Sequence, residues 1–233
     1  GVVIIVGITI KILSLIAEWP EITQNLNLIW ISLLIVLAVF IGRVLVAIFY
    51  YWRAINHAKR GNYRHTITDL NKAIKFMPLI GKDYVNRGNN YCATGDFDRA
   101  IAEFDTAIQI KPWDMAAYIA RGNAYSSKGN FDRAIADYDI AIRFVPDFVD
   151  TYNFRGNAYG YKEDYSRAIA DFDKAIQLKP DFADAYCGRG NAFGNKGEHD
   201  RALADFDRAI QLKPDFANAY GGRGSAYSSK GNY

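Results

Sequence analysis

The sequence predicts an all-α protein, in which a solenoid of helical hairpins is preceded by one or two transmembrane helices. Three observations lead to this fold class. The motif RGNAY and its variants recur every 34 residues, starting at Arg87, Arg121, Arg155, Arg189 and Arg223. Apolar residues within each unit are three or four positions apart, which is helical spacing. An apolar run from residue 28 to residue 52 is long enough to cross a bilayer.

Residues 1–46 are expected to form a membrane anchor, because their only charges are Lys11, Glu18, Glu21 and Arg43. The segment from residue 28 to residue 50 contains no acid and no proline, and as a helix it spans about 34 Å, against about 30 Å for the hydrocarbon core. Trp30 and the aromatic cluster at 49–52 suit the two headgroup regions. We therefore predict a transmembrane helix from residue 28 to about residue 50, with lipid contacts through residues 1–52.

Residues 1–17 are also apolar and predict a second membrane helix, joined to the first by residues 18–27, where Pro20 provides turn chemistry. A signal peptide is less favoured, because the segment has no basic start and no small-residue cleavage pattern. Because the sequence does not begin with methionine, we expect it to be a fragment. We also expect a further helix after Tyr233, or a partner that covers that end of the solenoid.

The flanking charges predict the orientation of the anchor. Between residues 47 and 80 there are six bases and one acid, Asp69, whereas the 18–27 loop has two acids and no base. Because bases are retained on the cytoplasmic side, we expect an integral membrane protein with its repeats facing the cytoplasm. Arg43 lies inside the apolar run, about 13 Å from Trp52 along the helix. It either extends toward the surface or faces a membrane-protein partner.

Each 34-residue unit is expected to be one helical hairpin. The units fall at 47–80, 81–114, 115–148, 149–182, 183–216 and, in part, 217–233. In the third unit, Gly122 and Ala134 let the two helices approach closely, while Tyr138 fills the space around their crossing point. Gly129 should end the first helix and Pro146 the second. No glycine or proline lies between residues 42 and 61, so the transmembrane helix should continue into the first repeat.

The unit length and this pattern of small and aromatic residues resemble the tetratricopeptide repeat (TPR) family. The third unit carries the pattern as Gly122, Tyr125, Ala134, Tyr138, Ala141 and Pro146, and the fourth repeats it as Gly156, Tyr159, Ala168, Phe172, Ala175 and Pro180. The resemblance implies a right-handed superhelix with a concave groove that binds a protein or an extended peptide. It covers the chain after residue 46.

Arginine stands at a half-buried position where the family usually has an apolar residue, namely at Arg87, Arg121, Arg155, Arg189 and Arg223. A charge there requires a partner. Acids recur with the same period on the second helices, at Glu103, Asp105, Asp137, Asp139, Asp171, Asp173, Asp205 and Asp207. We hypothesise a structural ladder of arginine and aspartate that links consecutive repeats. The alternative is that the arginines converge on bound phosphate.

A column of asparagines follows the motif glycines, at Asn89, Asn123, Asn157 and Asn191, a position that faces the concave groove in the family. Carboxamides both donate and accept hydrogen bonds, so with Lys82 these residues form the expected partner-binding site. Small neighbours such as Gly188 and Gly222 should make the groove wide. The alternative is that each asparagine bonds to the next repeat. A chaperone-tail clamp is not expected, because Val85, Ile119, Asn153 and Cys187 replace its key lysine.

The sequence gives no sign of catalysis, of a cofactor or of nucleic-acid binding. His57, His65 and His199 lack the spacing of metal ligands. Cys92 and Cys187 lie on different repeats, almost three units apart, too far for a disulfide. The function predicted is a membrane-tethered, non-enzymatic scaffold for a protein or peptide partner, used in assembly or recruitment, with a membrane-protein complex as one setting. The alternative is the repeat region of a multi-span membrane enzyme, similar to glycosyltransferases with such repeats, whose catalytic part lies outside this sequence.

Overall fold

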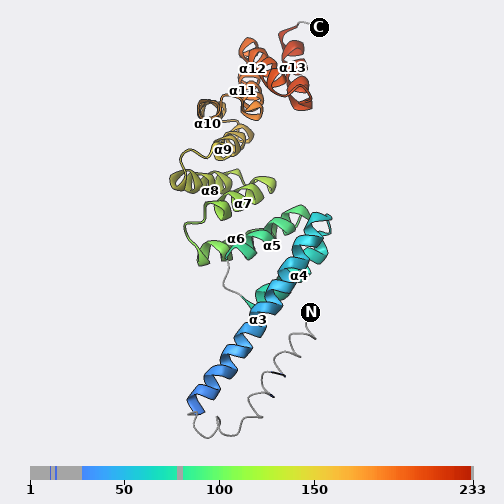
Figure 1. Cartoon of the computed structure of the whole chain (residues 1–233). Helices are drawn as coiled ribbons and strands as arrows, with labels where there is room; N and C mark the ends of the chain where they lie inside the picture. Colours follow the sequence, from blue (N-terminus) through green and yellow to red (C-terminus); the bar gives the residue numbers. More distant parts are fainter. Residues whose placement is uncertain (1–10, 12–13, 15–27, 78–80, 232–233) are drawn as a thin grey trace. The chain divides into compact units, whose positions relative to one another are not determined.

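The computed structural model describes residues 11, 14, 28–77 and 81–231. Apart from Lys11 and Ser14, the predicted span 1–17 and the connection 18–27 lie outside the described residues. Within the described part of the chain, all regular structure is α-helical and is arranged as antiparallel hairpins (Figure 1). The predicted all-α hairpin array is therefore confirmed.

The chain forms two compact units, Gly1–Asp96 and Phe97–Tyr233. The first unit contains α3 (Leu28–Lys59), α4 (Tyr63–Phe76) and α5 (Gly81–Ala93). The helices of the second unit are α6 (Phe97–Ile110), α7 (Met115–Ser127), α8 (Phe131–Phe144), α9 (Val149–Tyr161), α10 (Tyr165–Leu178), α11 (Ala183–Asn195), α12 (His199–Leu212) and α13 (Ala217–Lys230).

Helix α3 is a single uninterrupted helix, which confirms that the helix predicted from the apolar run continues without a break as far as Lys59. Its C-terminal half packs on α4, where the small side chains of Ala47 and Ala54 are buried. Its N-terminal half carries large exposed apolar side chains, such as Val36 and Phe40, which are 66% and 58% exposed. The stretch Ile31–Lys59 is long and apolar enough to cross a membrane, a property that membrane spans share with signal sequences. Arg43 is exposed on this helix.

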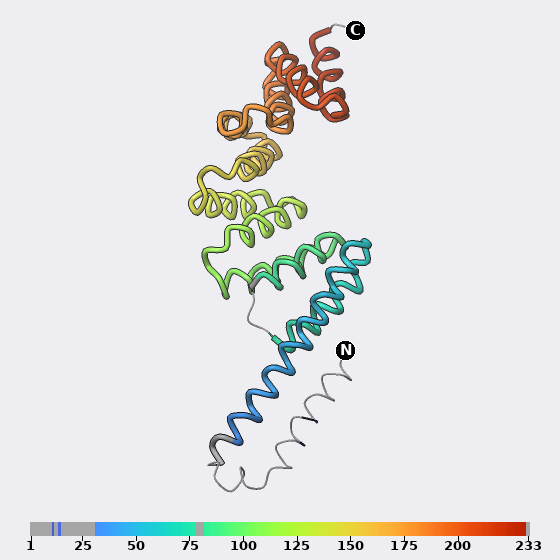
Figure 2. Tube along the Cα trace, in the orientation of Figure 1, coloured from blue at the N-terminus to red at the C-terminus, as the bar shows by residue number. Residues whose placement is uncertain are grey.

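In the second unit, each hairpin packs against the next along the chain, as the trace in Figure 2 shows for α7 to α13. The second helix of each repeat contributes one buried aromatic residue at the same position: Phe104, Tyr138, Phe172 and Phe206. The alanines one turn away, such as Ala134 and Ala141 around Tyr138, are fully buried and leave room for the ring. The core of this unit is therefore a row of aromatic rings, one per hairpin.

Two glycines from successive repeats hold the ring of Phe172. A Cβ atom at Gly156 would lie 3.0 Å from the ring, and a Cβ atom at Gly188 would lie 2.5 Å from it. The corresponding distances around Phe206 are 3.0 Å for Gly190 and 2.5 Å for Gly222. Core packing therefore requires glycine at Gly188 and Gly222, because any side chain there would collide with the aromatic ring.

The turn inside each hairpin needs one residue in the left-handed conformation. Gly129 has φ of 75° and follows the last residues of α7, as predicted. In the fourth repeat the same position is occupied by Glu163, which adopts φ of 61°. The geometry of the hairpin therefore imposes this conformation on a residue that does not favour it.

Candidate functional site

Arg121 joins two repeats through two aspartates. Its Nε and Nη2 donate to Asp137 of its own repeat at 2.8 and 2.6 Å, and its Nη1 donates to Asp105 of the preceding repeat at 2.5 Å. The guanidinium also lies over the ring of Tyr118, 5.5 Å from its centroid. Asp137 is buried, whereas Asp105 is partly open to solvent.

The same arrangement recurs along the second unit. Arg155 contacts Asp171 and Asp139 in this way, and Arg189 contacts Asp205 and Asp173. Arg223 donates to Asp207 of the preceding repeat at 2.7 Å. Arg121, Arg155 and Arg189 are thus each held between carboxylates of consecutive hairpins, whereas Arg223 contacts the carboxylate of the preceding hairpin.

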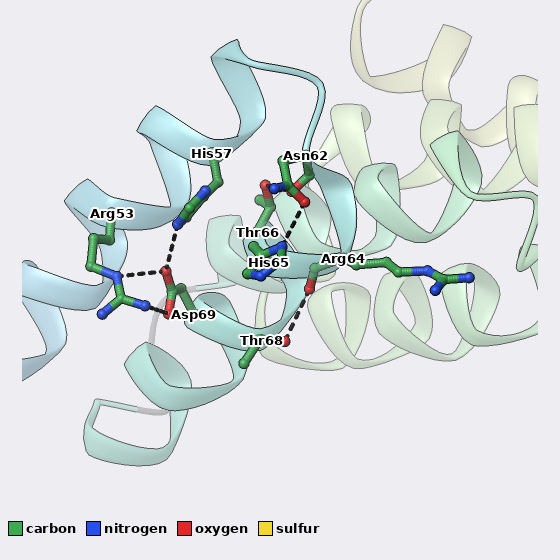
Figure 3. A network of polar contacts seen from close by, with 8 residues as sticks. All are labelled: Arg53, His57, Asn62, Arg64, His65, Thr66, Thr68 and Asp69. Carbon is green, nitrogen blue, oxygen red and sulfur yellow. Dashed lines mark hydrogen bonds and ion pairs between the residues drawn. The ribbon is translucent and has the colours of Figure 1, made fainter.

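The first repeat contains a member of this series that the sequence analysis missed. Arg53 of α3 donates to Asp69 of α4 at 2.9 and 2.8 Å, with His57 at 3.7 Å from the same carboxylate (Figure 3). Arg53 precedes Arg87 by 34 residues, but Ala54 replaces the motif glycine and hides the repeat. Arg87 in turn donates to the neutral amide of Asn71, where later repeats have aspartate.

Burial and pairing act in opposite directions on the carboxylates. Burial raises the pKa of Asp137 and of Asp171, while the hydrogen bonds from Arg121 and Arg155 oppose that rise. Hydrogen bonds to the aspartates raise the pKa of both arginines above the ordinary value. The arginine is thus what makes an ionised carboxylate tolerable at this depth.

A polar groove of about 750 Å³ runs across the first helices of four repeats in the second unit. Its walls come from one face each of α7, α9, α11 and α13, together with Tyr138 of α8 and Phe216. Its polar lining consists mainly of carboxamides and hydroxyls: Asn123, Asn153, Asn157, Asn191, Asn218, Ser126, Ser127 and Tyr161. Asp184 is the one lining residue, among those the structure describes, with a charged side chain at neutral pH.

The predicted asparagines do not all share this groove. Asn123, Asn157 and Asn191 line it, and Asn157 and Asn191 are exposed. Asn123 accepts a hydrogen bond from the hydroxyl of Tyr138 in its own repeat at 2.7 Å. This bond exists because the third repeat has tyrosine where the neighbouring repeats have phenylalanine, and it differs from the alternative bond to the next repeat.

Asn89 and Lys82 line a separate groove of about 330 Å³ in the first unit. Lys59, Asn86 and Asn90 also contribute to that groove. The two grooves therefore differ in charge: the groove of the first unit contains lysines, and the groove of the second unit contains an aspartate.

Asn153 is a groove residue that the sequence analysis did not select. Its side chain is 8% exposed, and its carboxamide oxygen is buried without a hydrogen-bond partner in the described structure. An unsatisfied buried acceptor costs about 1–3 kcal/mol. The sequence does mark this residue as unusual in one way: at the same position of other repeats stand the less polar residues Val85, Ile119 and Cys187. Only comparison with those three residues would have marked it as unusual.

The second unit also has a smaller cavity beside this groove. It has a volume of about 260 Å³ and shares Asn157 and Asn191 with the larger groove. Its remaining lining includes Tyr165 and the ring of Phe172.

Cysteines and possible metal ligands are further groups of chemical interest among the described residues. Burial, with a contribution from Asp184, raises the pKa of the Cys187 thiol to about 11, so the thiol is protonated at neutral pH. Burial also raises the pKa of Cys92. Among the residues that the structure describes, no group of three His, Cys, Asp or Glu side chains could hold a metal ion.

Stacked hairpins with a polar groove on their first helices define a helical-repeat protein of the scaffold class. A family model described as TPR repeat matches residues 88–129, 122–162 and 156–197, and a second, described as tetratricopeptide repeat, matches residues 183–216. Together the matched residues make up more than half of the chain. The chain therefore belongs to the tetratricopeptide repeat family, whose members are typically non-catalytic scaffolds for protein–protein interactions.

Several solved structures share the fold. A crystal structure of MamA matches with a TM-score of 0.65 and 24% identity, covering 74% of this chain and 94% of MamA. A tetratricopeptide repeat protein from Parabacteroides merdae matches with a TM-score of 0.73 and 20% identity, covering 80% and 74%. YrrB, described as a TPR protein with an unusual peptide-binding site, matches with a TM-score of 0.57 and 25% identity, covering 70% and 84%. A comparison with curated proteins found no match.

Proposed function

We propose that this protein is a membrane-tethered scaffold that binds an extended peptide segment of a partner protein in the groove of α7, α9, α11 and α13. The anchor comprises residues 1–46, and the repeats, from residue 47 onward, lie on the cytoplasmic side. The observation that carries the proposal is the 750 Å³ groove with its five asparagines. The peptide-binding site described for YrrB supports it as an analogy.

The asparagines suit a peptide for a chemical reason. An extended backbone presents an N–H donor and a C=O acceptor at each residue, and one carboxamide can satisfy both kinds of group. Asn157 and Asn191 stand at the same position of successive repeats, so the array offers such a group at regular intervals along the groove. Because nearly all the lining is uncharged, most of the binding energy would come from hydrogen bonds and apolar contact.

The peptide-binding role can be tested with the full chain in lipid nanodiscs and a fluorescent library of nonapeptides. We expect the double variant Asn157→Ala, Asn191→Ala to weaken binding about tenfold, because each lost hydrogen bond is worth about 0.5–1.5 kcal/mol. Both residues are exposed, so the folded state should survive. The matched control is Gln177→Ala, which removes an exposed carboxamide of α10 outside the groove. Unchanged affinity in the double variant would contradict the proposal.

The tether can be tested by alkaline extraction of membranes that contain the expressed chain. We expect the protein to stay in the pellet, and a larger fraction of the triple variant Val36→Asp, Leu37→Asp, Phe40→Asp to be extracted, because each charge costs about 3 kcal/mol near the centre of a span. The control Ile110→Asp changes an exposed apolar residue outside α3. Protease digestion of inside-out and right-side-out vesicles then tests the orientation. Extraction of the unmodified chain would refute the tether.

A further inference from the structure

The groove in the second unit carries negative charge and no positive charge among its described lining residues. Asp184 is the one charged side chain among the lining residues that the structure describes, and it is exposed. The asparagines around it can donate or accept, so they do not compensate its charge. A ligand that fills this groove must therefore place a polar or positively charged group against a carboxylate.

Asn153 adds an independent observation that points to a donor on the ligand. Its oxygen is a buried acceptor with no partner, and its side chain lines the same groove. Repeat packing does not require a carboxamide at this position, because Val85, Ile119 and Cys187 occupy it elsewhere. The unsatisfied oxygen therefore weakens the fold in the absence of a ligand, and an N–H group from a bound ligand would remove this penalty.

The two helices that carry these groups are neighbours. Asn153 and Asn157 are one turn apart on α9, and α9 contacts α11. On α11, Asp184, Cys187 and Asn191 follow one another at three- and four-residue spacing, so they share one face. Asp184 and Asn153 thus line the same groove from neighbouring helices, and each contributes an oxygen acceptor.

We propose that this groove recognises a cationic peptide, in which the charged group of a lysine or arginine pairs with Asp184. An N–H donor of the same segment then bonds to the oxygen of Asn153. The proposal rests on the peptide-binding function above and specifies its ligand. Ammonium and guanidinium groups are donors without acceptors, which matches the acceptors available here. An acidic side chain at this place would face Asp184 and be rejected.

The test uses the full chain in phosphatidylcholine nanodiscs, whose lipid carries no net charge that would attract the peptides. Three fluorescent nonapeptides share the same alanine and serine flanks and differ at the centre, which is lysine, norleucine or glutamate. We expect the lysine peptide to bind about threefold to fivefold more tightly than the norleucine peptide, the effect of an ion pair with an exposed carboxylate, and the glutamate peptide to bind least. The preference for lysine should weaken as salt is added.

Two variants assign the preference to the groove. Asp184→Asn should remove the difference between lysine and norleucine, whereas the control Asp181→Asn, an exposed aspartate outside the groove, should keep it. Asn153→Val should raise the Tm, because it removes the unsatisfied oxygen, and should lower the affinity for the lysine peptide about fivefold. A gain in stability with a loss of binding is a combination that a purely structural residue would not show.

The outcomes separate this inference from the proposed function. Equal binding of the lysine and norleucine peptides, abolished by Asn157→Ala with Asn191→Ala, would overturn the inference and leave the peptide-binding scaffold standing. Equal losses in Asp184→Asn and Asp181→Asn would indicate general attraction and would also overturn it. Unchanged affinity in Asn153→Val would remove that residue from the site. Failure of the lysine, norleucine and glutamate peptides and of the nonapeptide library to bind would refute both proposals.

Discussion

Replacing Arg121 by methionine is expected to lower the free energy of unfolding by about 3–5 kcal/mol, because it leaves the buried carboxylate of Asp137 without its partner. Methionine keeps most of the side-chain volume, so the loss reflects charge and hydrogen bonding rather than a cavity. The measurement is chemical denaturation of the full chain in detergent, followed by far-ultraviolet circular dichroism. Arg143→Met, which removes an exposed arginine of α8, is the matched control and should change stability by less than about 0.5 kcal/mol.

A second variant identifies the source of this loss. Adding Asp137→Leu to Arg121→Met removes the unpaired charge, so part of the lost stability should return. The hypothesis that the arginines converge on bound phosphate predicts a different result, namely loss of ligand with unchanged stability. Wild-type stability in Arg121→Met would therefore reject the structural ladder.

Replacing Phe172 by alanine is expected to cost about 3–5 kcal/mol, the usual effect of removing a buried aromatic ring. The ring is 2% exposed and lies against the backbone of Gly156 and Gly188, which have no side chains that could move into the space. The loss should therefore stay near the upper end of that range. The control is Trp113→Ala, which removes a larger ring that is 64% exposed and should change stability by less than about 0.5 kcal/mol.

The same contact can be tested by changing the glycine instead of the ring. Gly188→Leu alone should destabilise the protein by about 1–3 kcal/mol, because its Cβ would meet the ring of Phe172 at 2.5 Å. In the Phe172→Ala background the same leucine has room, so it should restore part of the stability. If Gly188→Leu destabilises both backgrounds equally, a collision with the ring of Phe172 is not the reason why residue 188 must be glycine.

The sequence was a good guide to the hairpins because a repeat protein is built from local contacts. The pattern around Gly122, Ala134 and Tyr138 relates residues less than 20 positions apart, and helical spacing together with the turn at Gly129 brings them to one crossing point. The turn at Gly129 and the continuous helix α3 were predictable for the same reason. Glu163 shows where this reasoning fails, since its local preference is overridden by the hairpin in which it lies.

The candidate site was harder to predict from the sequence, because the burial of a residue and its hydrogen-bond partners depend on residues of neighbouring helices. The recurrence of arginine and aspartate suggested which residues pair, but Arg53 and Asp69 escaped notice because Ala54 broke the motif. Asn123 and Asn157 lie in the same motif, RGNAY, yet Asn123 bonds to Tyr138 because the buried ring of that repeat carries a hydroxyl.

The sequence by itself determined the length of the repeat, the hairpin in each unit and the apolar helix that leads into the first one, because each depends on the order of residues along a single helix or turn. Tertiary structure alone decided which groups are left without a partner. It buried the oxygen of Asn153 and brought Asp184 to the same groove, and in the first unit it placed Lys82 and Asn89 together in another groove. These properties arise where helices of different repeats meet, and no single helix contains the atoms that define them.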